Sequence, residues 1–439
     1  MNRYLIAVAG VVLTLAATVA VVAYQHATGG GTVAAADSSV PGSGSSAIVV
    51  DWNKELVKIV NTPGAQPATI HPTRSFAILH VAIYNAVAST TRRNTPYLFS
   101  LDAPAGARLD AAAAEAGHDV LVSLYPSWKA PLDQQLAGEL ASIPSGKPKT
   151  QGVAVGALSA TLTLALRAND GSNVPPPAIP AGTQPGQYRP APPTFTPPVF
   201  TQWANVTPFV LQSADQFRPA APRAVTSSAY QRAIDEVKSL GEKTSTTRTA
   251  DQTQIAKFWP GPIWVSWNEI AESSALAHHT DLARTAQLFA LLNLSFADTT
   301  IAFYDAKYTY LVWRPITAIR EGGSGTPAEA ANPTWTPLLG TAPDPSYPGA
   351  HSAISAAGAA VLASFFGDAD NLSVNSDTLP GVVRTFDSYS AAANEAGLSR
   401  IYGGVHTRID HVAGAQLGRD VAAFVLNESH SSGFGFIGT

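Results

Sequence analysis

The sequence predicts an all-α protein that contains one long, irregular, Pro-rich segment. Apolar residues recur at helical spacing through most of the chain, whereas the alternating runs typical of strands are few. Of the 439 residues, 46% are hydrophobic and only 13% are charged, which allows a large buried core. Residues 171–222 hold 13 of the 33 prolines, a density that excludes helix interiors and central strands.

The first 36 residues have the pattern of a secretory signal. Arg3 is followed by an uncharged stretch at residues 4–24, and the small residues 34–36 fit a cleavage site. The apolar stretch is longer than in most signals, so an uncleaved membrane anchor is an alternative. We expect a secreted, extracytoplasmic protein that meets a membrane only through this segment, if it is uncleaved, and a flexible tether at residues 37–50.

Helical periodicity predicts two halves on either side of the Pro-rich segment. The predicted helices are 73–89, 108–125, 132–143 and 151–168 in the first half, and 229–240, 265–278, 282–305, 307–319, 351–366, 376–396 and 408–426 in the second. Residues 171–222 form either a wall or lid over a site or a linker between the halves. Trp203, Phe209 and Phe217 indicate a segment that packs against other residues.

The composition excludes several classes of function. The chain has no cysteine, which rules out disulfides, thiolate metal sites, iron–sulfur clusters and a catalytic thiol. A formal net charge of −4 argues against a nucleic-acid partner held by overall basic charge. Several histidines lack the carboxylate spacing of a metal hydrolase, and we interpret them as structural: His71, His80, His118, His278 and His279.

Two cations, Lys307 and Arg314, lie in the otherwise apolar segment KYTYLVWRP. Their separation of seven residues equals two helical turns, so we expect both side chains to point the same way. Pro315 should disturb the helix directly after them. Buried cations need an anion, so the pair indicates either an anion site or a solvated helix face.

His351 belongs to the segment SYPGAHS, in which a Pro-Gly turn leads into a helix of small residues. Such a turn presents backbone N–H groups and the positive end of the helix dipole, which together favour an anion. A single histidine in this position can equally be structural. The segment therefore indicates a site only in combination with other motifs.

His406 and Asp410 lie four residues apart in the segment SRIYGGVHTRIDH. This spacing places imidazole and carboxylate on one helical face. The carboxylate can then hold the Nδ1 proton and leave Nε2 free as a ligand or nucleophile. A capped helix with a structural histidine is the alternative for this motif alone.

Together, the motifs K-x6-R-P, P-x-x-H and S-R-x5-H-x3-D resemble the signature of the type 2 phosphatidic acid phosphatase superfamily. That superfamily includes the vanadium-dependent haloperoxidases and the bacterial non-specific acid phosphatases. Upstream segments around Arg74, Trp203, Trp267 and residues 305–320 are similar to the secreted haloperoxidases. The resemblance covers most of residues 50–427. It implies a single domain at residues 51–439, made of helical bundles of the vanadium chloroperoxidase and acid phosphatase type.

The resemblance also implies a role for each matching cation and for the cofactor. Lys307, Arg314 and Arg400 would bind the equatorial oxygens of vanadate, the implied cofactor, or of phosphate. Three positive charges suit an oxyanion that carries two or three negative charges.

The remaining matching residues would carry out the chemistry. His406 would provide the single bond from protein to vanadium, or attack phosphorus in a phosphatase. His351 would act as acid and base beside the apical oxygen, and Asp410 would orient His406.

One motif departs from the family pattern, and one acidic residue bears on halide use. The second motif is usually P-S-G-H, but here Gly349 and Ala350 precede His351, so the serine hydroxyl is missing. The backbone N–H groups of both residues could still bind the anion, and a lost hydrogen bond to a charged partner costs about 1.5–3 kcal/mol. Asp344 lies five residues before Gly349, where an acidic side chain would repel a halide.

Three functions follow as hypotheses. The first is a vanadate-dependent haloperoxidase, a peroxidase whose partners are hydrogen peroxide and a halide. The second is a secreted acid phosphatase, in which a phosphate ester is the substrate and His406 forms a phosphohistidine. The third is a non-catalytic oxyanion-binding protein, which the missing serine favours.

Overall fold

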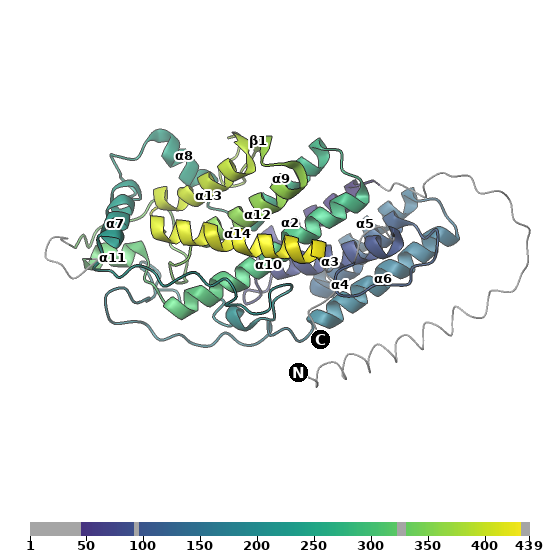
Figure 1. Ribbon diagram of the computed structural model, residues 1–439, viewed down its shortest axis with the longest axis horizontal. Helices are drawn as coiled ribbons and strands as arrows, with labels where there is room; N and C mark the ends of the chain where they lie inside the picture. Colours follow the sequence, from purple (N-terminus) through teal and green to yellow (C-terminus); the bar gives the residue numbers. More distant parts are fainter. Residues whose placement is uncertain (1–44, 92–95, 323–330, 432–439) are drawn as a thin grey trace, which may run out of the picture. The chain divides into compact units, whose positions relative to one another are not determined.

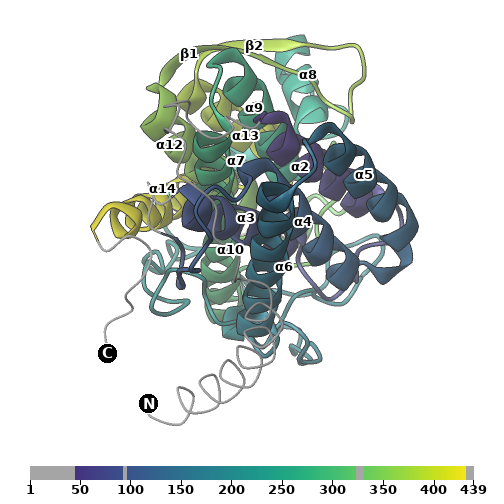
Figure 2. The ribbon, with the colours of Figure 1, turned by 90° about the vertical axis from the view of Figure 1, so that its right-hand side faces the viewer.

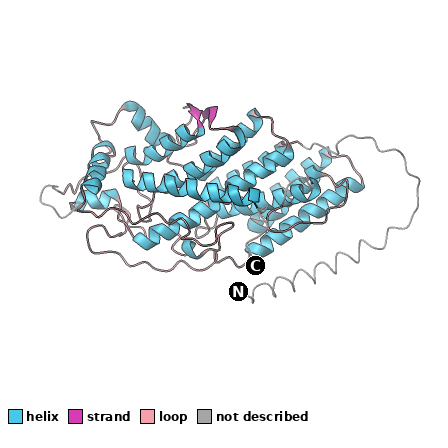
Figure 3. Cartoon of the chain, in the orientation of Figure 1, coloured by secondary structure: helices cyan, strands magenta, loops and turns pink. Residues whose placement is uncertain are grey.

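The structure, a computed structural model, describes residues 45–91, 96–322 and 331–431, which belong to one compact unit. Their regular secondary structure is almost entirely helical, with a single two-stranded hairpin among the described residues (Figure 3). The signal predicted at residues 1–36 lies outside the described residues, as does the tether up to residue 44. The end of the predicted tether is different: α2 begins at Ala47 and buries Ile48, Val49 and Val50.

The helices of the first half follow the predicted periodicity except α2, which was not among the predicted helices. They are α2 (Ala47–Asn61), α3 (Pro72–Thr91), α4 (Leu109–Leu124), α5 (Lys129–Ser142) and α6 (Lys147–Arg167), with the 3-10 turn η2 (Pro126–Trp128). The Pro-rich segment contains the 3-10 turn η3 (Trp203–Asn205). The second half contains α7 (Ser228–Leu240), α8 (Ala250–Phe258), α9 (Ile263–Ala277), α10 (Leu282–Tyr310), α11 (Pro315–Glu321), α12 (Ala350–Phe366), α13 (Tyr389–Tyr402) and α14 (Arg408–Ser431). The two halves meet through contacts of α10 with α3 and α2.

Helix α10 forms the centre of the fold (Figure 1). It is long and apolar enough to cross a membrane, but 94% of its most apolar window is buried inside the protein. Its neighbours include α3, α12 and α14. An apolar helix covered on all sides is the expected core of a large helical domain.

The contact between α12 and α14 is unusually close because two glycines of α14 face the backbone of α12. A Cβ atom on Gly414 would lie 2.2 Å from the carbonyl oxygen of Gly349, and one on Gly418 would lie 1.9 Å from that of Ala353. No larger residue fits at either position without moving a helix. The glycines therefore fix how the start of α12 lies against α14.

The Pro-rich segment packs against the helices and is not a free linker. Asp298 of α10 accepts backbone N–H groups from Phe209, Val210 and Leu211 at 2.6–2.9 Å. Trp203 and Phe209 are buried, and Phe217 is partly buried. Of the two predicted alternatives for this segment, the described contacts favour a wall over a linker.

Three predicted elements differ from the structure. The helices predicted at 282–305 and 307–319 are one helix to Tyr310 and a separate short α11, because Leu311 adopts a left-handed conformation (φ 49°). The helix predicted at 376–396 begins only at Tyr389, after the antiparallel hairpin of β1 (Ala369–Val374) and β2 (Arg384–Ser388) (Figure 2). Helix α8 was not predicted, although Thr249 and Gln252 form its capping box.

Candidate active site

Lys307 and Arg314 meet at the buried carboxylate of Asp344. Lys307 Nζ lies 3.5 Å from Asp344 Oδ2, and Arg314 Nη2 donates a hydrogen bond to Asp344 Oδ1. Arg314 Nε also donates to the backbone oxygen of Asp344 at 2.7 Å. All three side chains are at most 8% exposed. The two cations are therefore buried and paired, and do not form a solvated helix face.

The two cations do not share one helix, which corrects the interpretation of their seven-residue spacing. Lys307 lies in the last turn of α10, whereas Arg314 is the N-cap of α11 with Pro315 at its first position. The left-handed Leu311 turns the chain between them. Both side chains reach Asp344 because of this turn and not because of helical periodicity.

Charge balance keeps the Asp344 carboxyl ionised. Burial raises its pKa, but Lys307 and Arg314 outweigh burial and hold the pKa below its usual value. Burial lowers the pKa of Lys307 to about 8, although Asp344 opposes that shift. Lys307 is therefore still mainly protonated at neutral pH, and it donates to the backbone oxygen of Pro345.

His406 and Asp410 are brought together by a capping box at the start of α14. Thr407 accepts a hydrogen bond from the Asp410 N–H at 3.2 Å, and its own N–H donates to Asp410 Oδ2 at 2.7 Å. The same Oδ2 lies 3.4 Å from His406 Nδ1 and accepts from Ser346 Oγ at 2.7 Å. The predicted contact is present, but His406 precedes the helix, so the cap and not a shared helical face creates it.

The hydrogen bonds of His406 define which of its nitrogens carries no proton. Arg314 Nη1 lies 3.1 Å from His406 Nε2, and a guanidinium can only donate, so Nε2 is the acceptor. The ring proton is then on Nδ1, facing Asp410. Burial, followed by Arg314, lowers the pKa of His406 to about 3. The imidazole is therefore neutral, with its Nε2 lone pair directed at the cation cluster, by which we mean Lys307, Arg314 and Arg400.

Arg400 and His351 complete the group with buried nitrogens that are not used. Arg400 Nε, Arg400 Nη1 and His351 Nε2 are buried and have no hydrogen-bond partner among the residues that the structure describes. Burial, then Arg314, lowers the pKa of Arg400 to about 10, so it remains charged at neutral pH. Burial, then Arg400 and His406, hold the pKa of His351 well below its usual value.

This donor set fits a tetrahedral oxyanion. A buried donor without a partner costs free energy, and the oxygens of vanadate or phosphate would supply the missing acceptors. Cationic nitrogen donors suit an anion and would repel a bare metal cation. The residues present therefore fit vanadate, with the unprotonated His406 Nε2 as the nitrogen that could bind vanadium in place of its hydrogen bond from Arg314.

The backbone at the start of α12 has fewer free N–H donors than the sequence predicts. The Gly349 N–H already donates to the backbone oxygen of Asp410 at 2.9 Å, which corrects the expectation that both amides are available. Ala350 begins α12, where N–H groups have no partner within the helix. Ser352 does not replace the missing serine, because its hydroxyl lies 2.9 Å from His411 Nδ1.

Sequence reasoning missed two contributors to this site and assigned a different role to a third, Asp344. Thr407 and Ser346 both bind the Asp410 carboxylate, and Asp344 pairs with the cations. The T-x-x-D pattern of Thr407 and Asp410 was a readable signal for the cap. The other two contacts depend on how the loop before α12 folds, which local sequence does not specify.

The Pro-rich segment forms one wall next to the site. The N–H of Val199 donates to the backbone oxygen of Pro343, directly before Asp344, at 3.1 Å. The N–H of Tyr188 donates to the backbone oxygen of Leu311 at 2.6 Å. These bonds attach the Pro-rich segment to the loop before Asp344 and to the turn before Arg314.

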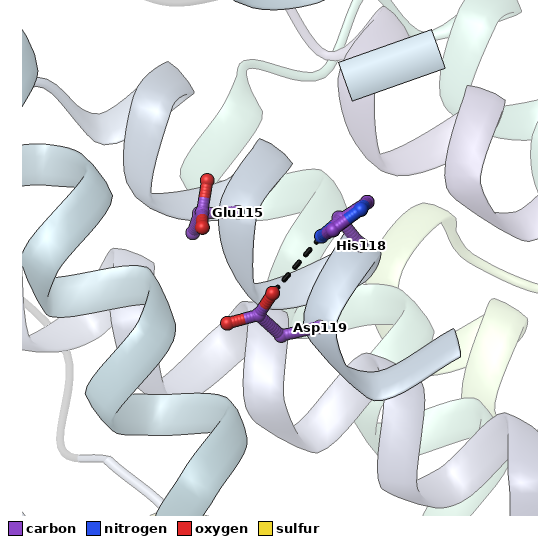
Figure 4. Close-up of side chains that lie close together, drawn as sticks. All are labelled: Glu115, His118 and Asp119. Atoms are coloured by element: carbon purple, nitrogen blue, oxygen red, sulfur yellow. Dashed lines mark hydrogen bonds and ion pairs between the residues drawn. The ribbon is translucent and has the colours of Figure 1, made fainter. Parts of the chain in front are cut away.

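A second group of histidine and carboxylates, Glu115, His118 and Asp119, lies on α4 (Figure 4). His118 Nδ1 is 2.9 Å from Asp119, and its Nε2 is 2.9 Å from Asp133. Hydrogen bonding to Asp119 is the main reason why the pKa of His118 is raised. With a carboxylate at each nitrogen, this ring favours the imidazolium form of an ion pair, in agreement with its interpretation as structural.

A separate cavity of about 270 Å³ lies beside the loop between α8 and α9. Its lining includes Gly261, Pro262, Glu269 and Asp377. Burial, then Asp377, raises the pKa of Glu269 to about 7. Residues of the cation cluster do not line it, so this cavity is not the oxyanion site.

Comparison with known proteins shows that the chain is similar to vanadium haloperoxidases. Residues 287–432 match the family model of the VCPO second helical-bundle domain. The chain is 25% identical over 232 residues to vanadium chloroperoxidase of Curvularia inaequalis. That alignment covers 38% of this chain and spans only 38% of the length of the curated relative.

Solved structures extend the likeness to most of the chain. The first bacterial vanadium-dependent iodoperoxidase is 27% identical, with a TM-score of 0.74 over 88% of this chain and 97% of its own. A holo-type bacterial vanadium-dependent chloroperoxidase is 17% identical, with a TM-score of 0.66 over 86% of this chain and 96% of its own. The predicted all-α fold of this type is confirmed.

Proposed function

We propose that this chain, a relative of the vanadium-dependent haloperoxidases, binds vanadate and oxidises a halide with hydrogen peroxide. The observation that carries the proposal is the buried contact of Arg314 with the unprotonated Nε2 of His406, together with the unpartnered donors of Arg400 and the unpartnered His351 Nε2. The similarity to a bacterial iodoperoxidase over nearly its whole length supports the same activity. Iodide is the first halide to test, because it is the easiest halide to oxidise.

In this proposal, the cation cluster and His406 hold the cofactor. Lys307, Arg314 and Arg400 bind its oxygens, and His406 Nε2 provides the bond to vanadium. Asp410 holds the Nδ1 proton and so keeps the imidazole in the tautomer that can bind. Bound vanadate supplies Lewis-acid activation of hydrogen peroxide without a change in its own oxidation state.

His351 has the properties of the general base of this site. It lies in the first turn of α12, and Arg400 and His406 both act on its pKa. Because that pKa is held low, the ring is neutral at physiological pH and can accept a proton at Nε2. A negatively charged cofactor next to the ring would raise the pKa and let the ring hold that proton.

The same residues would hold phosphate, so the test must separate oxidation from ester hydrolysis. Purified protein is assayed with and without orthovanadate, using hydrogen peroxide, iodide or bromide and a halogenation dye. A chromogenic phosphate ester is assayed in parallel. We expect halogenation that requires vanadate and that is lost in His406→Ala but kept in His279→Ala, which removes an exposed histidine.

Each contrary outcome points to a different function. Ester hydrolysis that vanadate inhibits, without halogenation, would identify a phosphatase with a phosphohistidine at His406. Binding of vanadate that depends on His406 but gives no turnover in either assay would identify a non-catalytic oxyanion-binding protein. Both outcomes contradict the proposed peroxidase activity.

We further propose that the protein is exported. The support is the sequence of residues 1–36, with one basic residue, an apolar stretch and a small-residue site. When the full chain is produced in a bacterial host, the exported protein should begin after residue 36 by N-terminal sequencing. Full-length protein in the membrane fraction would indicate an anchor, and processed protein found only in the cytoplasm would contradict export.

A further inference from the structure

We propose that Asp344 is a built-in counter-ion of the oxyanion site, which lowers the affinity for anions of high charge and so sets which oxyanions bind. The inference rests on the oxyanion site of the proposed function. The sequence suggested only that Asp344 would repel a halide. In the structure its carboxylate pairs directly with two of the three cations that would hold the cofactor, so it also acts on oxyanion binding.

The contacts of the cations divide the site into two parts. Arg314 uses Nε and Nη2 on Asp344, and uses Nη1 on His406 and on the backbone oxygen of Val405 at 2.9 Å. Lys307 lies between Asp344 and the backbone oxygens of Pro345 and Ser346. In contrast, two nitrogens of Arg400 have no partner among the described residues. An oxyanion therefore meets free donors at Arg400, but shares Arg314 and Lys307 with a carboxylate.

Asp344 is fixed in this position by its backbone. Its N–H donates to the backbone oxygen of Ala342 at 3.0 Å, and its carbonyl oxygen accepts from Arg314. The preceding Pro343 is bonded to Val199 of the Pro-rich wall. The carboxylate therefore does not need to move to make its contacts, and we infer a permanent charge in the site and not a gate.

This permanent charge changes the electrostatic balance of the site. His406 and His351 are neutral, so the buried charges are the three cations and the carboxylates of Asp344 and Asp410. Their net charge is +1, and it would be +2 without Asp344. At short range in a protein interior, one unit of charge acts about twice as strongly on a divalent anion as on a monovalent anion of the same shape.

The test uses two tetrahedral oxyanions of similar size and different fixed charge, tungstate (−2) and perrhenate (−1). Binding is measured by calorimetry for the wild type, Asp344→Asn and the control Asp305→Asn, at about pH 6.5 so that Lys307 stays charged. Asp305 also pairs with an arginine, Arg218 at 2.6 Å, but outside the cation cluster. Asp344→Asn keeps the shape and an oxygen acceptor while removing the charge.

We expect the ratio of tungstate to perrhenate affinity to rise about tenfold or more in Asp344→Asn and to stay unchanged in Asp305→Asn. A purely structural role of Asp344 would weaken both anions together and leave the ratio unchanged, which would overturn the inference. If Asp344→Asn does not fold, Asp344→Ser provides a second neutral variant, and Asp344→Glu should keep the wild-type ratio.

The two proposals fail in different ways. Wild-type protein that binds tungstate and vanadate while the ratio does not respond to Asp344→Asn refutes only the counter-ion role. Wild-type and variant proteins that bind none of these oxyanions refute the proposed oxyanion site and the counter-ion role together.

Discussion

Lowering the pH from about 7 to about 5 should weaken this protein, because at least three buried histidines are held neutral in the fold. Burial lowers the pKa of His71, His80 and His406 from 6.5 to about 3. In the unfolded chain these side chains titrate near 6.5 and bind protons that the folded state does not accept. Their contribution to stability is therefore complete above the unfolded pKa and is lost as the pH falls towards 3.

The size of the effect follows from proton linkage. Between about pH 7 and about pH 5, each such histidine reduces the free energy of unfolding by about 2 kcal/mol, and the three together by about 6 kcal/mol. Because all three folded pKa values lie well below 5, the loss depends mainly on the unfolded value. This loss is comparable to the whole stability of many domains, typically about 5–15 kcal/mol.

Urea unfolding at both pH values measures the loss directly. His80→Gln keeps a donor for Asn53, whose side-chain oxygen lies 2.7 Å from His80 Nε2, and should make the loss about 2 kcal/mol smaller. The control His279→Gln removes an exposed histidine and should lose as much stability as the wild type. Burial raises the pKa values of Glu139 and Glu269 to about 7, so both gain protons in the folded state over this range and offset part of the total loss. The difference between wild type and His80→Gln isolates the histidine contribution, and an unchanged loss in His80→Gln would refute the reasoning.

Other changes test how the fold supports the site. Asp298→Ala leaves three buried N–H groups of the Pro-rich segment without an acceptor and should lower the free energy of unfolding by about 3–5 kcal/mol, measured in urea. Thr407→Ala removes half of a capping box and should cost about 1 kcal/mol in the same assay, whereas Asp410→Ala should weaken vanadate binding about 10–100-fold by calorimetry. Gly418→Ala should displace α12 and weaken vanadate binding. The control Gly138→Ala has open space at its Cβ, so it should leave vanadate binding unchanged and raise the free energy of unfolding by up to about 1 kcal/mol through the exposed α5.

Much of the fold could be predicted from local pattern, because apolar spacing and helix punctuation are local properties. The bounds of α3, α6 and α12 lie within a few residues of the prediction. The hairpin of β1 and β2 was missed because its alternation is short and half-exposed. The start of α2 was missed because the polar residues before it resemble a linker.

The residues of the candidate site could be identified from sequence, but the reasons for their meeting could not. The spacing of Lys307 and Arg314 suggested one helical face, whereas the left-handed Leu311 between them breaks the helix. The spacing of His406 and Asp410 also suggested a shared helical face, whereas His406 precedes α14 and contacts Asp410 through the capping box at the start of that helix. In both cases the motif identifies the right residues, but the tertiary structure, and not helical periodicity, brings them together.

The helix ends explain why short motifs identify this site so well. Residues near helix ends border backbone groups without an intrahelical partner, and prolines and glycines fix where each helix begins or stops. The functional residues lie at such ends: Lys307 in the last turn of α10, Arg314 at the N-cap of α11, His351 in the first turn of α12, Arg400 in the last turn of α13, and His406 just before α14. Asp344 belongs to no helix, so its charge can change without disturbing a motif. We therefore infer that the charge of the site is set at this position, while the helix ends keep its geometry constant.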